Sequence, residues 1–145
     1  MHAFPHQYTV SASGRPDGDV ALSGGDLPDL ATAPPPQFDG PGDRWSPEEL
    51  LVGAVADCFI LTFRAIARAS KLEWTDLECS AEGTLDRVDR VTKFTAFTVR
   101  ASLTVPDGSD AEKAAKLLEK AENSCLITRS LEAGTHLEAE VIVLS

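Results

Sequence analysis

The segment Trp45–Ser70, WSPEELLVGAVADCFILTFRAIARAS, decides the fold of this chain. It begins with the signals of a helix start, because Ser46 can cap the helix and Glu49 completes a capping box. The residues from Leu50 to Phe63 are then apolar on nearly every side, and a helix without a polar face belongs inside a protein. The segment therefore predicts a long, buried central helix with Cys58 near its middle.

The totals predict one globular domain. At 145 residues the chain is expected to form a single domain over residues 1–145. Its net charge of −10 argues against binding nucleic acid through the phosphates, which needs a basic surface. The N-terminus lacks the basic start and apolar stretch of a signal peptide. The Leu50–Phe63 run is shorter than the roughly 20 apolar residues of a membrane span, so no membrane association is expected.

The cysteines indicate a reducing compartment. Three cysteines, an odd number without close spacing, do not make a secreted disulfide framework, so a cytoplasmic location is expected. No cluster of cysteines or histidines has the spacing of a zinc site, and neither a metal nor another cofactor is expected.

The remaining segments predict an α+β fold with antiparallel sheets packed on the central helix. Residues 1–45 should hold a hairpin and a long loop rich in glycine and proline, residues 46–70 the central helix, and residues 71–145 strands and C-terminal helices. The expected strands and helices, in order, are strands over Gln7–Ser13 and Asp19–Ser23, the central helix, strands over Leu72–Asp86 and Val91–Val105, a helix from Asp110, a short helix from Cys125 to about Gly134, and a final strand.

Two cysteines have settings that could support thiol chemistry. Cys58 lies in apolar surroundings, which raise the pKa of a thiol, so a reactive Cys58 needs a cation brought from elsewhere. Cys125 is expected at a helix start, where backbone N–H groups can stabilise a thiolate. Burial as small hydrophobic residues remains the alternative for both. Cys79, on an alternating strand, is expected in the core. Asp57 either pairs with Arg64 or lines the site, and pairing is favoured because a buried charge needs a partner.

Several motifs carry a resemblance to a known family. SPEELLVGAVADCF (Ser46–Phe59) resembles the signature of the OsmC/Ohr family of thiol hydroperoxide reductases, in which a Ser/Asn-Pro-Glu-x-Leu start leads to a cysteine. AENSC (Ala121–Cys125) resembles the second cysteine of that family, although Leu126 stands where a proline is usual. The hairpin and its Gly-Arg turn are similar to the Ohr-type opening, so the resemblance covers essentially the whole chain.

The resemblance implies an OsmC-like fold, an intertwined homodimer and a two-cysteine peroxidase of the oxidative stress response. Cys58 is then the peroxidatic thiol, which reduces organic hydroperoxides to alcohols, and Cys125 resolves its sulfenic acid as a disulfide. An external dithiol, of lipoyl or similar type, recycles the pair. Glu48 is the carboxylate that orients an active-site arginine, for which Arg15 is the first candidate.

The position of that arginine stays open at the level of sequence. Arg15 is followed by an extra Pro16, and the Phe38–Gly40 stretch, where related proteins have an arginine just before, is preceded here by Gln37. Arg44, beside the helix start, is another candidate. A non-catalytic OsmC-like protein, which binds an apolar ligand or senses oxidants in a pocket at the dimer interface, is the alternative function.

Helix geometry adds an argument for the dimer. Glu48 and Cys58 are ten residues apart, which on one continuous helix is about 15 Å along the axis. A glutamate side chain cannot span that distance, so Glu48 cannot reach the Cys58 thiol of its own chain. Either the helix breaks near Gly53, or Glu48 comes from a second subunit. The apolar helix favours the second option, because it needs more cover than one small domain provides.

The apolar surroundings of Cys58 predict the substrate class. Burial of an alkyl chain contributes roughly 0.8 kcal/mol per methylene, which favours organic hydroperoxides over hydrogen peroxide. The side chains expected to provide these surroundings are Val55, Phe59, Phe63 and Phe97.

Overall fold

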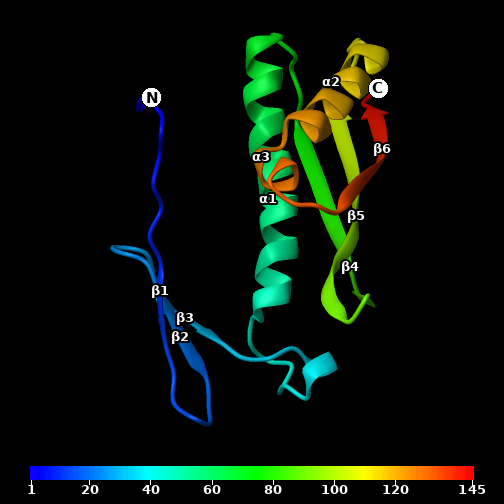
Figure 1. The fold of residues 1–145 in the computed structure, drawn as a ribbon. Coiled ribbons are helices and arrows are strands. Elements are labelled where there is room, and N and C mark those ends of the chain that lie inside the picture. Colours follow the sequence, from blue (N-terminus) through cyan, green and yellow to red (C-terminus); the bar gives the residue numbers. More distant parts are fainter. The chain divides into compact units, whose positions relative to one another are not determined.

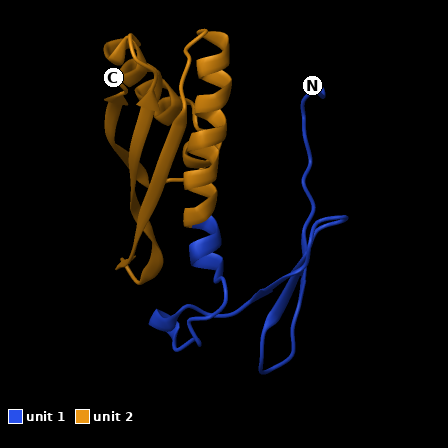
Figure 2. Cartoon of the chain, turned by 180° about the vertical axis from the view of Figure 1, so that it is seen from behind, with its two compact units in different colours: residues 1–51 blue, residues 52–145 orange.

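A computed structural model describes residues 1–145 and forms two compact units, Met1–Leu51 and Val52–Ser145 (Figure 2). The single domain over residues 1–145 stays a prediction.

The first unit contains a small antiparallel sheet. Its strands β1 (Ser11–Ser13), β2 (Val20–Ser23) and β3 (Leu30–Thr32) lie in the order β1-β2-β3. The β1–β2 hairpin was predicted, whereas β3 falls in the segment that was expected to be irregular. Thr32 explains the extra strand in part, because its hydroxyl donates to the Val20 carbonyl at 3.2 Å and ties the strand to β2.

A tight turn follows β3. The 3-10 helix η1 (Pro36–Phe38) leads into Gly40, whose N–H donates to the Pro35 carbonyl. A Cβ atom on Gly40 would overlap the Pro34 carbonyl oxygen, so only glycine fits there.

Helix α1 (Pro47–Ala69) is the predicted central helix and crosses from the first unit into the second without a break at Gly53. The Glu49 N–H donates to the Ser46 hydroxyl at 3.1 Å, and that hydroxyl donates to the Glu49 carboxylate at 2.8 Å. The capping pair is therefore the predicted one, although the carboxylate accepts from the serine hydroxyl rather than from the serine N–H.

The second unit is a three-stranded sheet with helices on one face (Figure 1). Its strands lie in the order β4-β5-β6, and its helices after α1 are α2 and α3. The bounds are β4 (Asp76–Val88), β5 (Val91–Val105), α2 (Ala111–Ser124), α3 (Leu126–Arg129) and β6 (Gly134–Val143).

The strand pairing follows from the connections. β4 and β5 form an antiparallel hairpin, but β6 pairs with β5 in parallel. A parallel partner requires a crossover connection, and α2 and α3 provide it. The fold is thus mostly antiparallel, as predicted, with one parallel pair that the sequence pattern did not indicate.

The core lies between the sheet and the helices. α1 contributes a stripe with a four-residue repeat, β5 contributes alternating residues, and α2 contributes its apolar face. The buried side chains of this core include Val55, Phe59, Phe63 and Ala67 of α1, Phe97, Val99, Leu103 and Val105 of β5, and Ala114, Leu118 and Ala121 of α2.

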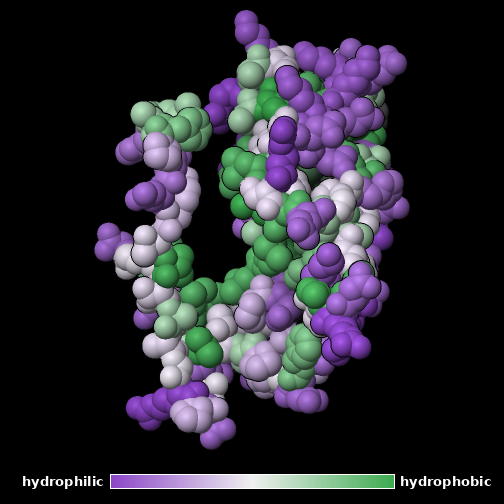
Figure 3. All heavy atoms as spheres, in the orientation of Figure 1, coloured by the Kyte–Doolittle hydropathy of each residue, from purple (hydrophilic) through white to green (hydrophobic).

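The chain by itself does not bury α1 all round, in line with the expectation that the helix needs more cover than one small domain provides. In its most apolar 18-residue window, 28% of the residues are buried within the chain. Leu61 is 57% exposed, and hydrophobic side chains continue along α1 on the visible face (Figure 3). The helix therefore carries apolar surface that its own chain leaves uncovered.

The length argument against a membrane span needs correction. α1 has 23 residues and is long and apolar enough to cross a bilayer by length and composition, whereas the argument used only the Leu50–Phe63 run. The core helix of a soluble protein passes the same test, so this property alone does not make α1 a membrane span.

Gly83 of β4 gives a test of the packing between α1 and the sheet. A Cβ atom there would lie 2.9 Å from side-chain atoms of both Val52 and Phe94. We expect Gly83→Ala to lower the free energy of unfolding by about 1–3 kcal/mol through overpacking, measured by urea denaturation. Gly134→Ala is the matched control, because a Cβ at Gly134 meets no atom within 4 Å. Equal stability of the two variants would contradict this packing.

Candidate active site

The first thiol of the site lies in the middle of α1. Cys58 is half-buried, and its sulfur is 3.7 Å from the Thr62 hydroxyl oxygen, one helical turn further on. This contact follows from the helix itself, because residues four apart lie on the same face.

The second thiol lies at the junction of α2 and α3. Asp110 caps α2 by accepting from the Lys113 N–H at 3.0 Å, and the helix runs to Ser124. Cys125 then leaves the helical conformation, with φ −65° and ψ 112°, and becomes the N-cap of α3. Its side chain is 2% exposed. α3 ends at Arg129, several residues before the predicted end near Gly134.

The fold brings Cys58 and Cys125 together, although 66 residues separate them along the chain. Burial raises the pKa of Cys58, but hydrogen bonds lower it by more. The donors are the Cys125 thiol, the Ile127 N–H, the Thr62 hydroxyl and the Leu126 N–H. The pKa of Cys58 is therefore lowered, and the thiolate form is favoured.

The pKa of Cys125, in contrast, is raised. Burial raises its pKa first, and the hydrogen bond with Cys58 raises it further, since that bond keeps the proton on Cys125. Thr128 opposes these effects through its N–H and hydroxyl. The expectation that Cys125 would be a thiolate is therefore wrong, because burial and the hydrogen bond with Cys58 outweigh the Thr128 donors at the helix start.

No cation is among the groups that lower the pKa of Cys58. Of the two arginine candidates in the first unit, Arg15 is exposed between β1 and β2, and the Arg44 Nε donates to the Asp19 carboxylate at 3.0 Å. The sequence argument that a cation must activate Cys58 did not allow for hydrogen-bond donors from α3.

Glu48 lies on the first turn of α1. Because α1 is continuous, Glu48 and Cys58 of one chain are about 15 Å apart along the helix axis. One Glu48 carboxylate oxygen, Oε1, is buried without a hydrogen-bond partner. A buried carboxylate oxygen without a donor is costly, so this position is suited to a cationic or N–H partner.

Two other sequence expectations need correction. Asp57 is exposed and forms no ion pair with Arg64. Cys79 is half-buried rather than part of the closed core, and burial, Asp57 and Cys125 raise its pKa to about 11. Cys79 is therefore a protonated, weakly nucleophilic thiol near neutral pH.

The apolar side chains expected to surround the substrate are closed off. Val55, Phe59, Phe63 and Phe97 are all fully buried in the core. Val55 and Phe59 line, with Cys125, a crevice that is too small for a water molecule. A peroxide cannot reach these side chains in this structure, so the apolar contacts near the thiols come from more exposed residues.

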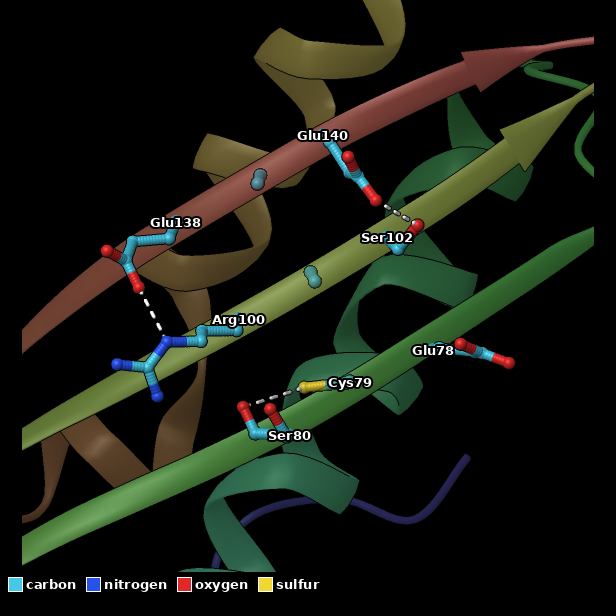
Figure 4. A pocket seen from close by; sticks show the side chains of 9 residues that line it. Glu78, Cys79, Ser80, Arg100, Ser102, Glu138 and Glu140 are labelled. Carbon is cyan, nitrogen blue, oxygen red and sulfur yellow. Dashed lines mark hydrogen bonds and ion pairs between the residues drawn. The ribbon is translucent and has the colours of Figure 1, made fainter.

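A larger hollow lies on the sheet near Cys79. An open groove of about 560 Å³ lies across β4, β5 and β6, with α1 and α2 behind the sheet (Figure 4). Arg100 there contacts the Glu138 carboxylate at 2.7 Å, and the Ser102 hydroxyl donates to Glu140 at 2.9 Å. The groove is charged and contains neither Cys58 nor Cys125, so we do not assign the thiol chemistry to it.

The comparisons with known proteins agree with this fold. The sequence pattern described as "OsmC-like protein" matches residues 40–140. The uncharacterized protein YmaD of Bacillus subtilis is 37% identical over 112 residues, which cover 75% of each chain.

The chain belongs to the OsmC-like family. A second relative, the protein named peroxiredoxin OsmC of Escherichia coli, is 27% identical over 96 residues, which cover 66% of each chain. An organic hydroperoxide resistance protein OsmC of Legionella pneumophila has a similar solved structure, with a TM-score of 0.75 and 23% identity over 97% of this chain and 99% of that one. The α+β, OsmC-like fold predicted from the sequence is thereby confirmed.

Sequence reasoning missed the groups that contact Cys58 in this OsmC-like chain. Thr62 could have been found, because the spacing of four residues on a helix places its hydroxyl beside the thiol. The N–H groups of Leu126 and Ile127 have no sequence signal, since every residue except proline carries one.

The opposite pKa shifts predict an order of reactivity. Of the three cysteines, Cys58 should react fastest with iodoacetamide at neutral pH, because its lowered pKa leaves a larger fraction of its thiol ionised. Cys79, with a pKa of about 11, should remain unmodified until the solution is strongly alkaline. Peptide mass spectrometry over a pH series measures each site separately. Faster labelling of Cys79 or Cys125 at pH 7 would contradict the assignment.

Proposed function

We propose that the protein is a two-cysteine peroxidase that reduces organic hydroperoxides to alcohols. The observation that carries the proposal is the half-buried Cys58, with a lowered pKa, in hydrogen-bond contact with the protonated Cys125. A peroxidatic thiol must be ionised, and a resolving thiol must be adjacent. The relative named a peroxiredoxin and the similar structure named for organic hydroperoxide resistance support the same chemistry.

In the first step the Cys58 thiolate attacks the peroxide. Its sulfur forms a bond to the terminal oxygen of ROOH, the O–O bond breaks, and an alkoxide leaves and is protonated to the alcohol. The sulfur is oxidised by two electrons to a sulfenic acid. No metal or organic cofactor takes part in this step.

In the second step Cys125 resolves the sulfenic acid. The Cys125 sulfur displaces hydroxide from Cys58, the thiol proton completes a water molecule, and a disulfide joins the two residues. An external dithiol of lipoyl type then reduces this disulfide by exchange and is itself oxidised to a disulfide. A cytoplasmic location, expected from the cysteine usage, would provide such a reductant.

We further propose a homodimer in which the active site takes residues from both chains. The continuous α1 separates Glu48 and Cys58 of one chain, so Glu48 would act at the thiol of a second subunit. The buried, unpartnered Glu48 oxygen would accept from a guanidinium, which we assign to Arg15. This guanidinium would neutralise the charge that develops on the peroxide oxygen.

The preference for organic hydroperoxides would depend on exposed apolar side chains next to the thiols. Leu126 follows Cys125 and is 67% exposed, and Leu61 lies three residues after Cys58. Either can contact an alkyl group without any change in the core.

Peroxide consumption with a dithiol reductant tests the function. Wild-type protein should consume an alkyl hydroperoxide faster than hydrogen peroxide, because roughly 0.8 kcal/mol is gained per buried methylene. Cys58→Ser should lower turnover to the uncatalysed background. Without the dithiol, Cys125→Ser should consume one equivalent and then stop, with a sulfenic acid that dimedone traps. Cys79→Ser is the control for loss of an unrelated thiol, and full turnover by Cys58→Ser would overturn the proposal.

The oligomeric state tests the shared site. Light scattering should give twice the chain mass of 15.5 kDa. Leu61→Glu should shift the protein toward monomer and reduce turnover, because it adds a charge to the uncovered apolar face of α1. Val91→Glu, at an exposed apolar residue of the β4–β5 hairpin, is the matched control. A folded wild-type monomer with full activity would contradict a site built from two chains.

A further inference from the structure

Helix α3 is attached to the core through a single buried residue. Thr128 is 8% exposed, whereas Leu126 and Arg129 are exposed and Ile127 is half-buried. A helix of four residues is too short to be stable by itself, so tertiary contacts fix its position. For α3 the buried contact is that of Thr128.

Thr128 packs against the part of α1 that carries the first thiol. Together with Cys125 it lines the closed crevice to which Val55 and Phe59 also contribute. Val55 and Phe59 lie within one turn of Cys58 on α1, and α3 lies beside the middle of that helix (Figure 1). Thr128 and Cys125 therefore share one wall of a contact whose other wall includes the turn of Cys58.

The Thr128 hydroxyl is bonded to the residue that carries the second thiol. It donates to the Cys125 carbonyl at 3.1 Å in a buried hydrogen bond, and the Arg129 N–H donates to the same carbonyl at 3.1 Å. The Cys125 N–H makes a longer bond, at 3.4 Å, to the Glu122 carbonyl. The backbone of Cys125 is thus held most closely at its carbonyl, by two donors from α3.

This bond differs from an ordinary threonine bond within a helix. A threonine hydroxyl often donates to the carbonyl three or four residues back, which satisfies the hydroxyl and does little else. Here the acceptor is the N-cap residue, with φ −65° and ψ 112°, at the point where α2 gives way to α3. No water can replace the hydroxyl, because the crevice is too small to hold one.

We propose that Thr128 is a positioning residue for the resolving step, and that its hydroxyl bond holds Cys125 where its sulfur can close a disulfide with Cys58. A disulfide tolerates little variation, since its two Cβ atoms must lie about 3.8 Å apart. Without the bond the α2–α3 junction can turn Cys125 away, and a sulfenic acid on Cys58 then persists and is oxidised further. The inference rests on the proposed function for the oxidant, but closure of the pair is measurable without any peroxide.

The experiment follows closure with DTNB, an aromatic disulfide that releases the coloured thiolate TNB, in the full chain carrying Cys79→Ser. One thiolate of the pair attacks DTNB, forms a mixed disulfide and releases a first TNB. The second thiol loses its proton to solvent, attacks the protein sulfur of the mixed disulfide, and releases a second TNB as the Cys58–Cys125 bond forms. Stopped-flow absorbance measures the two releases separately, and the intact mass identifies the linked product.

Removal of the hydroxyl should slow the second release alone. Thr128→Val is close to isosteric and should leave the first release unchanged, while the second slows on the order of fivefold for the loss of one hydrogen bond. Thr128→Ala removes the same hydroxyl without placing a methyl group in the crevice and should give the same result. Thr128→Ser keeps the hydroxyl and should restore the wild-type rate.

Thr75→Val is the matched control. The Thr75 hydroxyl donates to the Thr104 carbonyl at 3.1 Å, and the Thr75 N–H donates to the same carbonyl at 2.9 Å. The substitution therefore deletes a hydroxyl bond of equal length from a carbonyl that keeps a second donor, as at Cys125. Both releases should keep their wild-type rates in this variant.

The outcomes separate this inference from the proposed function. An unchanged second release in Thr128→Val and Thr128→Ala would overturn the inference, even if the wild-type protein reduced peroxides. Equal slowing of both releases, or slowing that Thr128→Ser does not recover, would indicate a general loss of packing and would overturn it as well. Slowed closure in a protein that consumes no hydroperoxide would support the positioning role and reject the peroxidase.

Discussion

The contact between the middle of α1 and the start of α3 is the interaction on which the site depends. It brings the Cys125 thiol to Cys58, and hydrogen bonds from that thiol and from the start of α3 lower the pKa of Cys58. The contact results from the topology of the second unit, because the parallel pairing of β5 and β6 requires a crossover, and that crossover carries the α2–α3 junction over the core beside α1. The sheet and its connection therefore determine the meeting of two residues that are distant in the chain.

The same contact resolves a conflict in the electrostatics of Cys58. A thiol within an apolar helix should be protonated, since burial disfavours its charged form. At Cys58 the hydrogen bonds lower the pKa by more than burial raises it. Cys125 is more deeply buried and retains the proton, so its pKa is raised. One shared proton thus distinguishes the two thiols, and the division into nucleophile and resolving residue follows from their positions.

The sequence predicted the elements of the fold better than their contacts. The capping residues Ser46 and Glu49 and the alternation over Val91–Val105 are local signals, and the helix start and strand occur where they indicate. The parallel β6 and the short α3 depend on tertiary packing, which no local pattern records. Both cysteines of the candidate site were identified through resemblance and helix position. The donors to Cys58 were not, because backbone N–H groups are the same in almost every residue.

Oxidation should join the two sulfur atoms covalently. Peptide mapping of the reduced protein after one equivalent of an alkyl hydroperoxide, without reductant, tests it most directly. We expect a linked Cys58–Cys125 peptide that is about 2 Da lighter than the two thiol peptides together, with Cys79 still free. A Cys58 peptide carrying sulfinic acid beside a free Cys125, or a disulfide that includes Cys79, would contradict the account.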